Sequence, residues 1–126
     1  LFMVGFQDPS VEFEFPKKRK LKFTMSDVMK GHVDREIGFT LRVGGKKSPI
    51  SDRRNWDGYI VDGEVRRLSP NEGKKMQGFP STFKFPVSDS EALKQLGNSV
   101  AVTAVQDYAN AIIQNLEIAY GAKRTA

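Results

Sequence analysis

The feature that most restricts the fold of this chain is a helix start that is repeated in its second half. Ser69-Pro70-Asn71-Glu72 has the pattern of a capping box, in which the serine hydroxyl and the glutamate carboxylate each accept the other residue's N–H. Proline suits the first helical position because it needs no N–H donor there. Since Gly78-Phe79-Pro80 cannot continue a helix, the pattern predicts one from Pro70 through Met76.

Two further helices are predicted directly downstream. Ser88-Asp89-Ser90-Glu91 repeats the start pattern, and this second helix should end near Gly97. Asn98 or Ser99 can then cap a long third helix, which Gly121 should end. One broad face of that helix is apolar: Ala101, Val102, Val105, Tyr108, Ala109, Ile112, Ile113, Leu116 and Ala119. Three helices cannot cover such a face, so we expect it to pack against further protein structure.

The region before these helices predicts a small sheet. Residues 59–66 read YIV-DG-EVR, and Asp-Gly between two such runs is the signal of a two-residue type I′ hairpin. Residues 37–43 (IGFTLRV) alternate as a strand does, and Ser26 can cap a short helix that runs through Met29. The expected fold class is therefore α+β, with a small, twisted, mostly antiparallel sheet and long loops followed by a three-helix segment, its last helix long.

The first residues predict a strand without its sheet. LFMVGF, residues 1–6, is a continuous apolar run, as in a strand buried inside a parallel sheet that this chain does not contain. Residues 7–16 are predicted to be an extended linker. A start at Leu1 within a strand suggests a fragment or a split subunit. Because no apolar run approaches ~18 residues, we expect no membrane span.

The net charge of +5 is unevenly distributed. Residues 17–22 (KKRKLK) contain five basic residues, and residues 35–54 contain six basic and two acidic ones. Residues 55–126 balance eight basic against eight acidic residues. The distribution favours a phosphate-binding face in the first half, with a solvated lysine-rich loop as the alternative.

Residues 44–58 (GGKKSPISDRRNWDG) predict a cationic loop. Arginine and lysine in such a loop can reach guanine or phosphate oxygens, and glycine lets the backbone approach a ligand closely. Gly44-Gly45 is equally compatible with a simple hairpin turn. Trp56 suits a core position better than stacking on a base. His32 has no cysteine or second histidine beside it, so it is expected at the surface and no metal site is predicted.

The motifs of the second half together resemble the last conserved blocks of the bacterial DNA (cytosine-5) methyltransferases. R-x-L-S-P-x-E at 66–72 and MQGFP at 76–80 are similar to the ninth block, and KQLGNSV at 94–100 is similar to the tenth. The hairpin precedes them as it does in that family. Asn71 departs from the arginine that is usual in the ninth block. The resemblance covers residues 1–6 and 35–119.

This resemblance implies a division of the chain and a role for its residues. Residues 1–16 would be the end of the eighth-block strand and a linker from the catalytic domain, 17–68 the target-recognition region, and 69–126 helices that pack on both. Contacts with duplex DNA would come from Thr40, Leu41, Arg42, Gly44, Gly45, Lys46, Lys47, Arg53 and Arg54. The ninth block would hold this region in shape through Arg66, Pro70, Glu72, Gln77 and Gly78, with a contact between Arg66 and Glu72.

The resemblance also implies a cofactor and a division of labour. Asn98, Ser99 and Val100 would lie beside S-adenosylmethionine, where a glycine turn that opens a helix presents free N–H groups. The family uses a cysteine thiolate to attack cytosine, but this chain has no cysteine. We therefore predict no catalytic residue here. The chain would be inactive alone and would work in the bacterial cytoplasm with an amino-terminal catalytic domain or subunit that binds most of the cofactor.

Two alternatives remain open from the sequence. The chain could be a free-standing basic module that binds nucleic acid without methylation, or a member of the RNA-directed branch of the family. GNS at 97–99 is also compatible with an ordinary helix cap.

Overall fold

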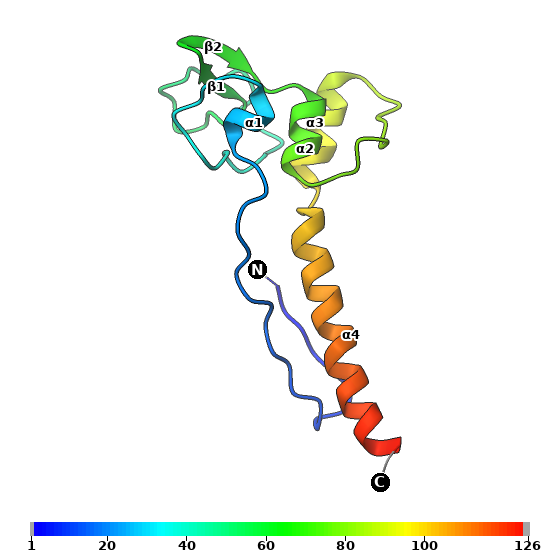
Figure 1. Cartoon of the computed structure of the whole chain (residues 1–126). Coiled ribbons are helices and arrows are strands. Elements are labelled where there is room, and N and C mark those ends of the chain that lie inside the picture. Colours follow the sequence, from blue (N-terminus) through cyan, green and yellow to red (C-terminus); the bar gives the residue numbers. More distant parts are fainter. Residues whose placement is uncertain (1, 125–126) are drawn as a thin grey trace. The chain divides into compact units, whose positions relative to one another are not determined.

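The computed structural model describes residues 2–124, so Leu1 and the end of the predicted 69–126 segment lie outside the described residues. The chain forms two compact units (Figure 1): residues 20–102, and the residues up to Arg19 together with those from Thr103 onward. The division into 1–16, 17–68 and 69–126 stays a prediction. The elements follow in the order α1 (Met25–Met29), β1 (Gly58–Val61), β2 (Glu64–Arg67), α2 (Pro70–Met76), α3 (Asp89–Asn98) and α4 (Val102–Arg124). The α+β class with a long last helix is confirmed.

The hairpin forms where the Asp-Gly pair predicts it. β1 and β2 pair in antiparallel register, with Tyr59 opposite Arg66 and Ile60 opposite Val65. Asp62 has φ 51° and Gly63 has φ 85°, so both turn residues take the left-handed conformation that a type I′ turn requires. Tyr59 and Val61 face the core, whereas Ile60 is exposed.

Helix α2 has the two ends that its sequence predicts. The Ser69 hydroxyl accepts the N–H of Glu72, and the Glu72 carboxylate accepts the N–H of Ser69 at 2.8 Å, so the capping box is complete. At the other end Gly78 has φ 77°. The N–H of Gly78 donates to the carbonyl of Lys75 and that of Phe79 to the carbonyl of Lys74, which is a Schellman motif.

Helix α1 begins two residues earlier than predicted, because its cap is Thr24 and not Ser26. Thr24 and Asp27 form a capping box, and the N–H of Thr24 donates to the Asp27 carboxylate at 2.7 Å. These hydrogen bonds lower the pKa of Asp27. The Ser26 hydroxyl instead accepts the N–H of Val33 at 3.0 Å and so fixes the chain after the helix.

The boundary between α3 and α4 also differs from the prediction. Asn98 is the last residue of α3, and Ser99 is its carboxy-terminal cap in an extended conformation. Neither residue therefore caps the next helix, and α4 begins only at Val102. Gly121 does not end α4, which runs through Arg124. A glycine inside a helix costs only about 1 kcal/mol, which a helix of this length can absorb.

Residues 37–43 do not form the predicted strand. Their backbone bonds elsewhere: the N–H of Phe39 donates to the Tyr59 hydroxyl at 2.9 Å, and the carbonyl of the preceding Glu36 accepts the N–H of Met25 at 3.0 Å. The alternating side chains also do not share one environment. Leu41 is buried, whereas Ile37 is 64% exposed. Because only some of the apolar side chains are buried and no partner strand is present among the described residues, residues 37–43 form a packed but irregular segment.

The core of the 20–102 unit is centred on Trp56, whose side chain is 1% exposed, as predicted for a core residue. It includes apolar side chains from α1, β1, α3 and the segments between the elements: Met25, Val28, Met29, Val33, Leu41, Tyr59, Val61, Leu68, Leu93 and Leu96. Met76 of α2 is partly buried against this cluster. Burial is the first cause of the raised pKa of Tyr59, whose hydroxyl accepts the Phe39 N–H. This core is the platform from which the loop of residues 44–54 extends.

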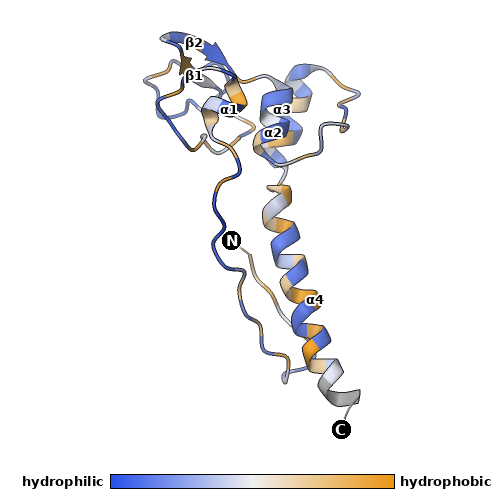
Figure 2. Ribbon diagram, viewed as in Figure 1, coloured by the Kyte–Doolittle hydropathy of each residue, from blue (hydrophilic) through white to orange (hydrophobic). Residues whose placement is uncertain are grey.

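In the other unit α4 packs with the amino-terminal segment. Residues 2–6 form no strand, and the ring of Phe2 stacks on that of Tyr108 with centroids 4.1 Å apart. Hydrophobic and hydrophilic residues alternate along α4 (Figure 2), and Val105 and Ile113 of the predicted apolar face are about half exposed. Packing of that face against further structure stays a prediction. Within the described residues, the helices are all too short or too polar to span a membrane.

Candidate nucleic-acid interface

Residues 44–54 of the predicted cationic loop are fixed at their base by the three consecutive buried residues that follow them. Asn55, Trp56 and Asp57 are 4%, 1% and 1% exposed. The Trp56 indole N–H donates to the carbonyl of Gly44 at 2.8 Å. The Asp57 carboxylate accepts the N–H of Lys47, with its two oxygens at 3.1 and 3.2 Å. Trp56 and Asp57 therefore anchor the first part of the loop, and we call Asn55, Trp56 and Asp57 together the anchor triplet.

Arg67 of β2 and the backbone of Gly45 complete this closure. Arg67 donates from Nη1 to Asp57 at 3.0 Å and from Nη2 to the carbonyl of Ser48 at 2.9 Å. Gly45 has φ 87°, and a Cβ there would lie 2.5 Å from the carbonyl oxygen of Arg54. Only glycine satisfies both conditions. The two ends of the loop therefore meet, as in an Ω-loop held on a rigid base. Gly44-Gly45 is not a hairpin turn, because no strands flank it.

The predicted DNA-binding cations divide into two groups. Arg54 binds Asp52 through Nε at 3.1 Å and Nη2 at 2.8 Å. These hydrogen bonds lower the pKa of Asp52 to about 2 and raise that of Arg54. Arg54 is therefore committed to the turn around it. The other four predicted cations have side chains without a hydrogen bond or ion pair in the described residues: Arg42, Lys46, Lys47 and Arg53.

The other predicted DNA contacts differ in what they can offer. Thr40 is exposed, whereas Leu41 is 6% exposed and belongs to the core, so its side chain is not open to a ligand. A Cβ on Gly44 would meet nothing within 4 Å, so the structure around it leaves open space at this backbone.

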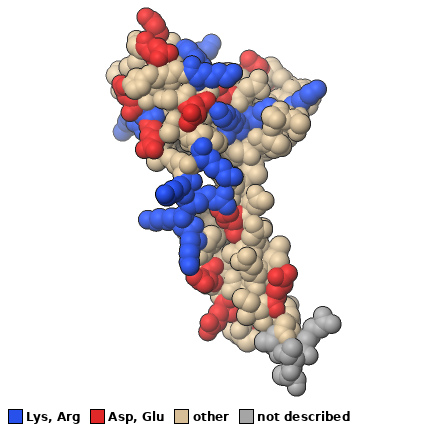
Figure 3. All heavy atoms as spheres, in the orientation of Figure 1, with Lys and Arg blue, Asp and Glu red and all other residues tan. Residues whose placement is uncertain are grey.

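The basic run before α1 adds further exposed charge. Lys17, Lys18, Lys20 and Lys22 are all exposed, whereas Arg19 pairs with Asp107 of α4. Figure 3 shows Lys and Arg side chains projecting freely from the face it draws. Exposed lysines on an irregular segment can follow a phosphate backbone without reading sequence.

The ninth-block residues connect three elements of the 20–102 unit. The predicted contact between Arg66 and Glu72 is confirmed, through Nη2 of the arginine and Oε1 of the carboxylate. Nη1 of Arg66 donates to the carbonyl of Met29 at 2.6 Å. Since Glu72 also closes the capping box of α2, Arg66 ties β2 to the end of α1 and to the start of α2.

Gln77 links the ninth block to the tenth, a role that its place in the motif did not indicate. Its side-chain N–H donates to the carbonyl of Leu96 at 3.1 Å, and its own carbonyl accepts the N–H of Val102 at 2.8 Å. The Ser99 hydroxyl donates to the same Leu96 carbonyl at 2.8 Å. The segment between α3 and α4 is thus held at both ends by one residue.

The predicted cofactor-side residues are the last residue of α3 and the two that follow it, and they do not open a helix. Asn98 ends α3, so the argument from free N–H groups at a helix start is wrong for this turn. The turn does offer the side-chain amide of Asn98, which is exposed and makes no hydrogen bond within the described residues. Val100 beside it is 54% exposed.

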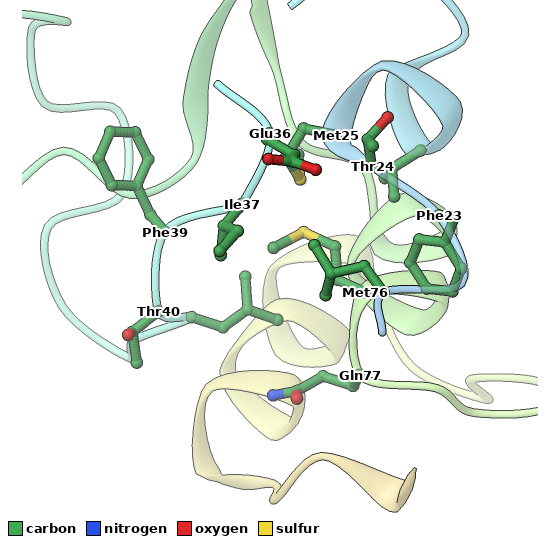
Figure 4. Close-up of a pocket in the computed structure, with 13 residues that line it drawn as sticks. Phe23, Thr24, Met25, Glu36, Ile37, Phe39, Thr40, Met76 and Gln77 are labelled. Carbon is green, nitrogen blue, oxygen red and sulfur yellow. The ribbon is translucent and has the colours of Figure 1, made fainter. Parts of the chain in front are cut away.

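A pocket of about 300 Å³ lies between α1, residues 36–41 and α2 (Figure 4). It is apolar at its centre, where Ile37 and Met76 point into it, with the Glu36 carboxylate at one side. Lys75 lies over the ring of Phe23 at 5.4 Å and Arg35 over that of Phe39 at 4.1 Å. One face of each aromatic ring is therefore already covered by a cation.

No metal site is found among the described residues, where His, Cys, Asp and Glu do not gather in groups of three or more that could hold a metal ion. His32 is exposed, as predicted, and its Nε2 lies 3.0 Å from the Asp34 carboxylate.

Comparison with known proteins identifies the family to which this chain is similar. The family described as C-5 cytosine-specific DNA methylase matches residues 12–114. The Type II methyltransferase M.SsoII of Shigella sonnei is 37% identical over 76% of this chain and 30% of its own length. The Type II methyltransferase M.DsaV of Dactylococcopsis salina is 32% identical, over 94% of this chain and 43% of its own length.

The Type II methyltransferase M.HpaII of Haemophilus parainfluenzae is 30% identical over 90% of this chain and 39% of its own length. The chain thus spans less than half the length of these three relatives. The family match covers the anchored loop, the hairpin and the helices that carry the ninth-block and tenth-block motifs. The chain belongs to the C-5 cytosine-specific DNA methylase family.

Proposed function

We propose that this chain recognises the DNA target and completes the cofactor pocket of a DNA (cytosine-5) methyltransferase of the restriction-modification type, which methylates cytosine within a short duplex site. The observation that carries the proposal is the loop of residues 44–54, whose base is locked by the anchor triplet while Lys46, Lys47 and Arg53 stay unpaired. A rigid base with unpaired cations suits a groove, because little ordering entropy is lost on binding.

The partner that fits this surface is duplex DNA. Arg42 and Arg53 carry the planar guanidinium that can bind O6 and N7 of guanine together in the major groove, so we assign base reading to them. Lys46, Lys47 and the lysines of residues 17–22 are assigned to phosphates, where a point charge is sufficient. The open space at Gly44 allows a close backbone approach. Thr40 would border the same contact, and Leu41 would support it from the core.

S-adenosylmethionine is the cofactor that the family implies, and it would supply the methyl group. The Asn98 amide fits a polar group of such a molecule, because it is exposed and not engaged in the described residues. Val100 offers an adjacent apolar contact, and Ser99 can still accept a hydrogen bond while it donates to Leu96. Most contacts with the cofactor would come from a catalytic domain or subunit.

The chain would take no part in bond formation at the cytosine. Addition to C6 of cytosine needs a strong nucleophile that also leaves well, for which the family uses a thiolate, and this sequence contains no cysteine. The target base would be flipped out of the duplex into the catalytic domain of the complete enzyme, in the bacterial cytoplasm. This chain would hold the duplex in register while that happens.

The proposal is tested by methyl transfer from radiolabelled S-adenosylmethionine to a plasmid. The chain alone should give no labelling, and the chain mixed with the catalytic part of a related enzyme should restore it. Labelling by the chain alone would contradict the assignment of bond formation to another part. Tight binding of duplex DNA without any restoration would instead identify a free-standing nucleic-acid-binding module, and preference for tRNA would identify an RNA-directed protein.

Neighbouring arginines of the loop should respond differently to replacement by alanine. Arg53→Ala should lower the affinity for preferred duplexes by ~1–3 kcal/mol and relax the sequence preference, as expected for a base contact. Arg42→Ala should act in the same way. Arg54→Ala is the matched control. Because Arg54 is already bound to Asp52, its replacement should change the sequence preference little.

The measurement is selection of preferred sequences from a random duplex pool, followed by titration of selected and scrambled duplexes. Lys17→Ala should weaken both duplexes alike and reduce the salt dependence. Equal weakening of both duplexes by Arg53→Ala would show that Arg53 binds phosphate and not a base.

A further inference from the structure

The contact that carries the inference joins the two sites just proposed. A Cβ built on Gly97 would lie 2.7 Å from the carbonyl carbon of Arg42, 2.9 Å from its oxygen and 3.0 Å from the backbone nitrogen of Val43. All three are backbone atoms, which cannot move aside as the end of a flexible side chain can. Gly97 does not have positive φ. The glycine is therefore required by close approach and not by its own backbone conformation.

Both sides of this contact are held firmly. On the α3 side, Leu93 and Leu96 are buried, and the Leu96 carbonyl is held by Gln77 and Ser99. On the loop side, Leu41 is buried in the same core immediately before Arg42. Because the two sides touch through backbone atoms, a displacement of the Arg42 peptide presses directly on the end of α3 at Gly97.

We propose that Gly97 is a positioning residue that couples the recognition loop to the cofactor-side turn. Its bare Cα seats the Arg42–Val43 peptide against the end of α3, so that DNA bound at Arg42 shifts the equilibrium position of residues 98–100, and cofactor bound there shifts the position of Arg42. Linkage requires the two effects on affinity to be equal. The inference rests on the proposed function, because it needs DNA at the loop.

Gly97→Ala distinguishes this role from that of an ordinary helical glycine. Alanine favours a helix more than glycine does, so replacing a glycine without a packing role should raise the stability. Against the Arg42 backbone the added methyl group should instead displace the peptide. We expect lower thermal stability and a loss of duplex affinity of about fivefold or more, the lower end of typical coupling between sites.

The control is Gly121→Ala, which also places alanine at a helical glycine. A Cβ on Gly121 would meet nothing within 4 Å, so this variant should keep its duplex affinity.

The decisive measurement uses the unmodified chain, labelled with ¹⁵N and titrated with the preferred duplex from the random pool. The amide signals of residues 98–100 should shift together with those of residues 44–54, and in Gly97→Ala the shifts of residues 98–100 should be lost or reduced. Movement of the loop signals while residues 98–100 stay unchanged would overturn the coupling. Absence of any shift in the loop would overturn the proposed DNA site itself. Because the first comparison needs no variant, it stands even if Gly97→Ala does not fold.

Discussion

Replacement of Trp56 by alanine is expected to lower the free energy of unfolding of the 20–102 unit by ~3–5 kcal/mol, the usual range for truncating a buried tryptophan. Trp56 is 1% exposed and belongs to the hydrophobic core of this unit. Its indole also donates to the carbonyl of Gly44. Because a small domain is stable by only ~5–15 kcal/mol, much of the unit should unfold near physiological temperature.

Trp56→Phe separates packing from the hydrogen bond. Phenylalanine keeps most of the apolar contact but leaves the Gly44 carbonyl without its donor, at a cost of ~1–3 kcal/mol. Both variants can be compared in urea by far-UV circular dichroism, since Trp56 is the chain's single tryptophan and its fluorescence is lost with it. A loss below 1 kcal/mol for Trp56→Ala would mean that the residue does not hold the core together.

The parts of the fold that follow from the sequence are those specified by neighbouring residues. Asp62-Gly63 determines the hairpin because both residues tolerate positive φ. Ser69 with Glu72 and the Gly78 terminus determine α2, since every group involved lies within about ten residues. Local signals of this kind succeed where the rest of the fold agrees with them.

The errors in the predicted fold arise where two hydrogen-bonding options compete for the same backbone. Residues 37–43 have a strand pattern, but the Tyr59 hydroxyl takes the Phe39 N–H that a neighbouring strand would need. Ser26 and Thr24 are both acceptable helix caps, and Asp27 favours Thr24 by completing its capping box. Ser99 could start a helix, but its hydroxyl bonds back to Leu96 and ends one instead.

The same distinction applies to the site. The sequence identifies the residue types of the cationic loop, but not which of its charges are already neutralised. Asp52 lies two residues before Arg54, and this spacing was the one local sign that Arg54 is paired. The contacts of Arg67 with Asp57 and of Gly97 with Arg42 span larger separations that no local pattern records.

Asp57→Ala should be the most damaging change to the loop that leaves the apolar core intact. The carboxylate is 1% exposed and is the acceptor for the Lys47 N–H and for Arg67. Removing one partner of a fully buried pair costs ~3–5 kcal/mol. Since the Arg67 side chain is 36% exposed and can be rehydrated, we expect about 2–3 kcal/mol here. Without this acceptor the loop should also become mobile.

Asp57→Asn tests whether shape or charge matters, because the amide oxygen can still accept the Lys47 N–H while the ion pair with Arg67 is lost. It should cost about 1 kcal/mol and preserve the order of the loop. Asp52→Asn is the matched control, a carboxylate in the same loop whose partner Arg54 is at the surface, and stability should hardly change.

The measurements are urea unfolding and hydrogen exchange at the Lys47 amide. Fast exchange is expected in Asp57→Ala and slow exchange in Asp57→Asn and Asp52→Asn. In the random duplex pool, only Asp57→Ala should lose sequence preference more than overall affinity, because its cations remain while their placement does not. Slow exchange at Lys47 in Asp57→Ala would show that the loop is ordered without the carboxylate, and base reading would then have to be ascribed to Arg42 and Arg53 independently of the anchor triplet.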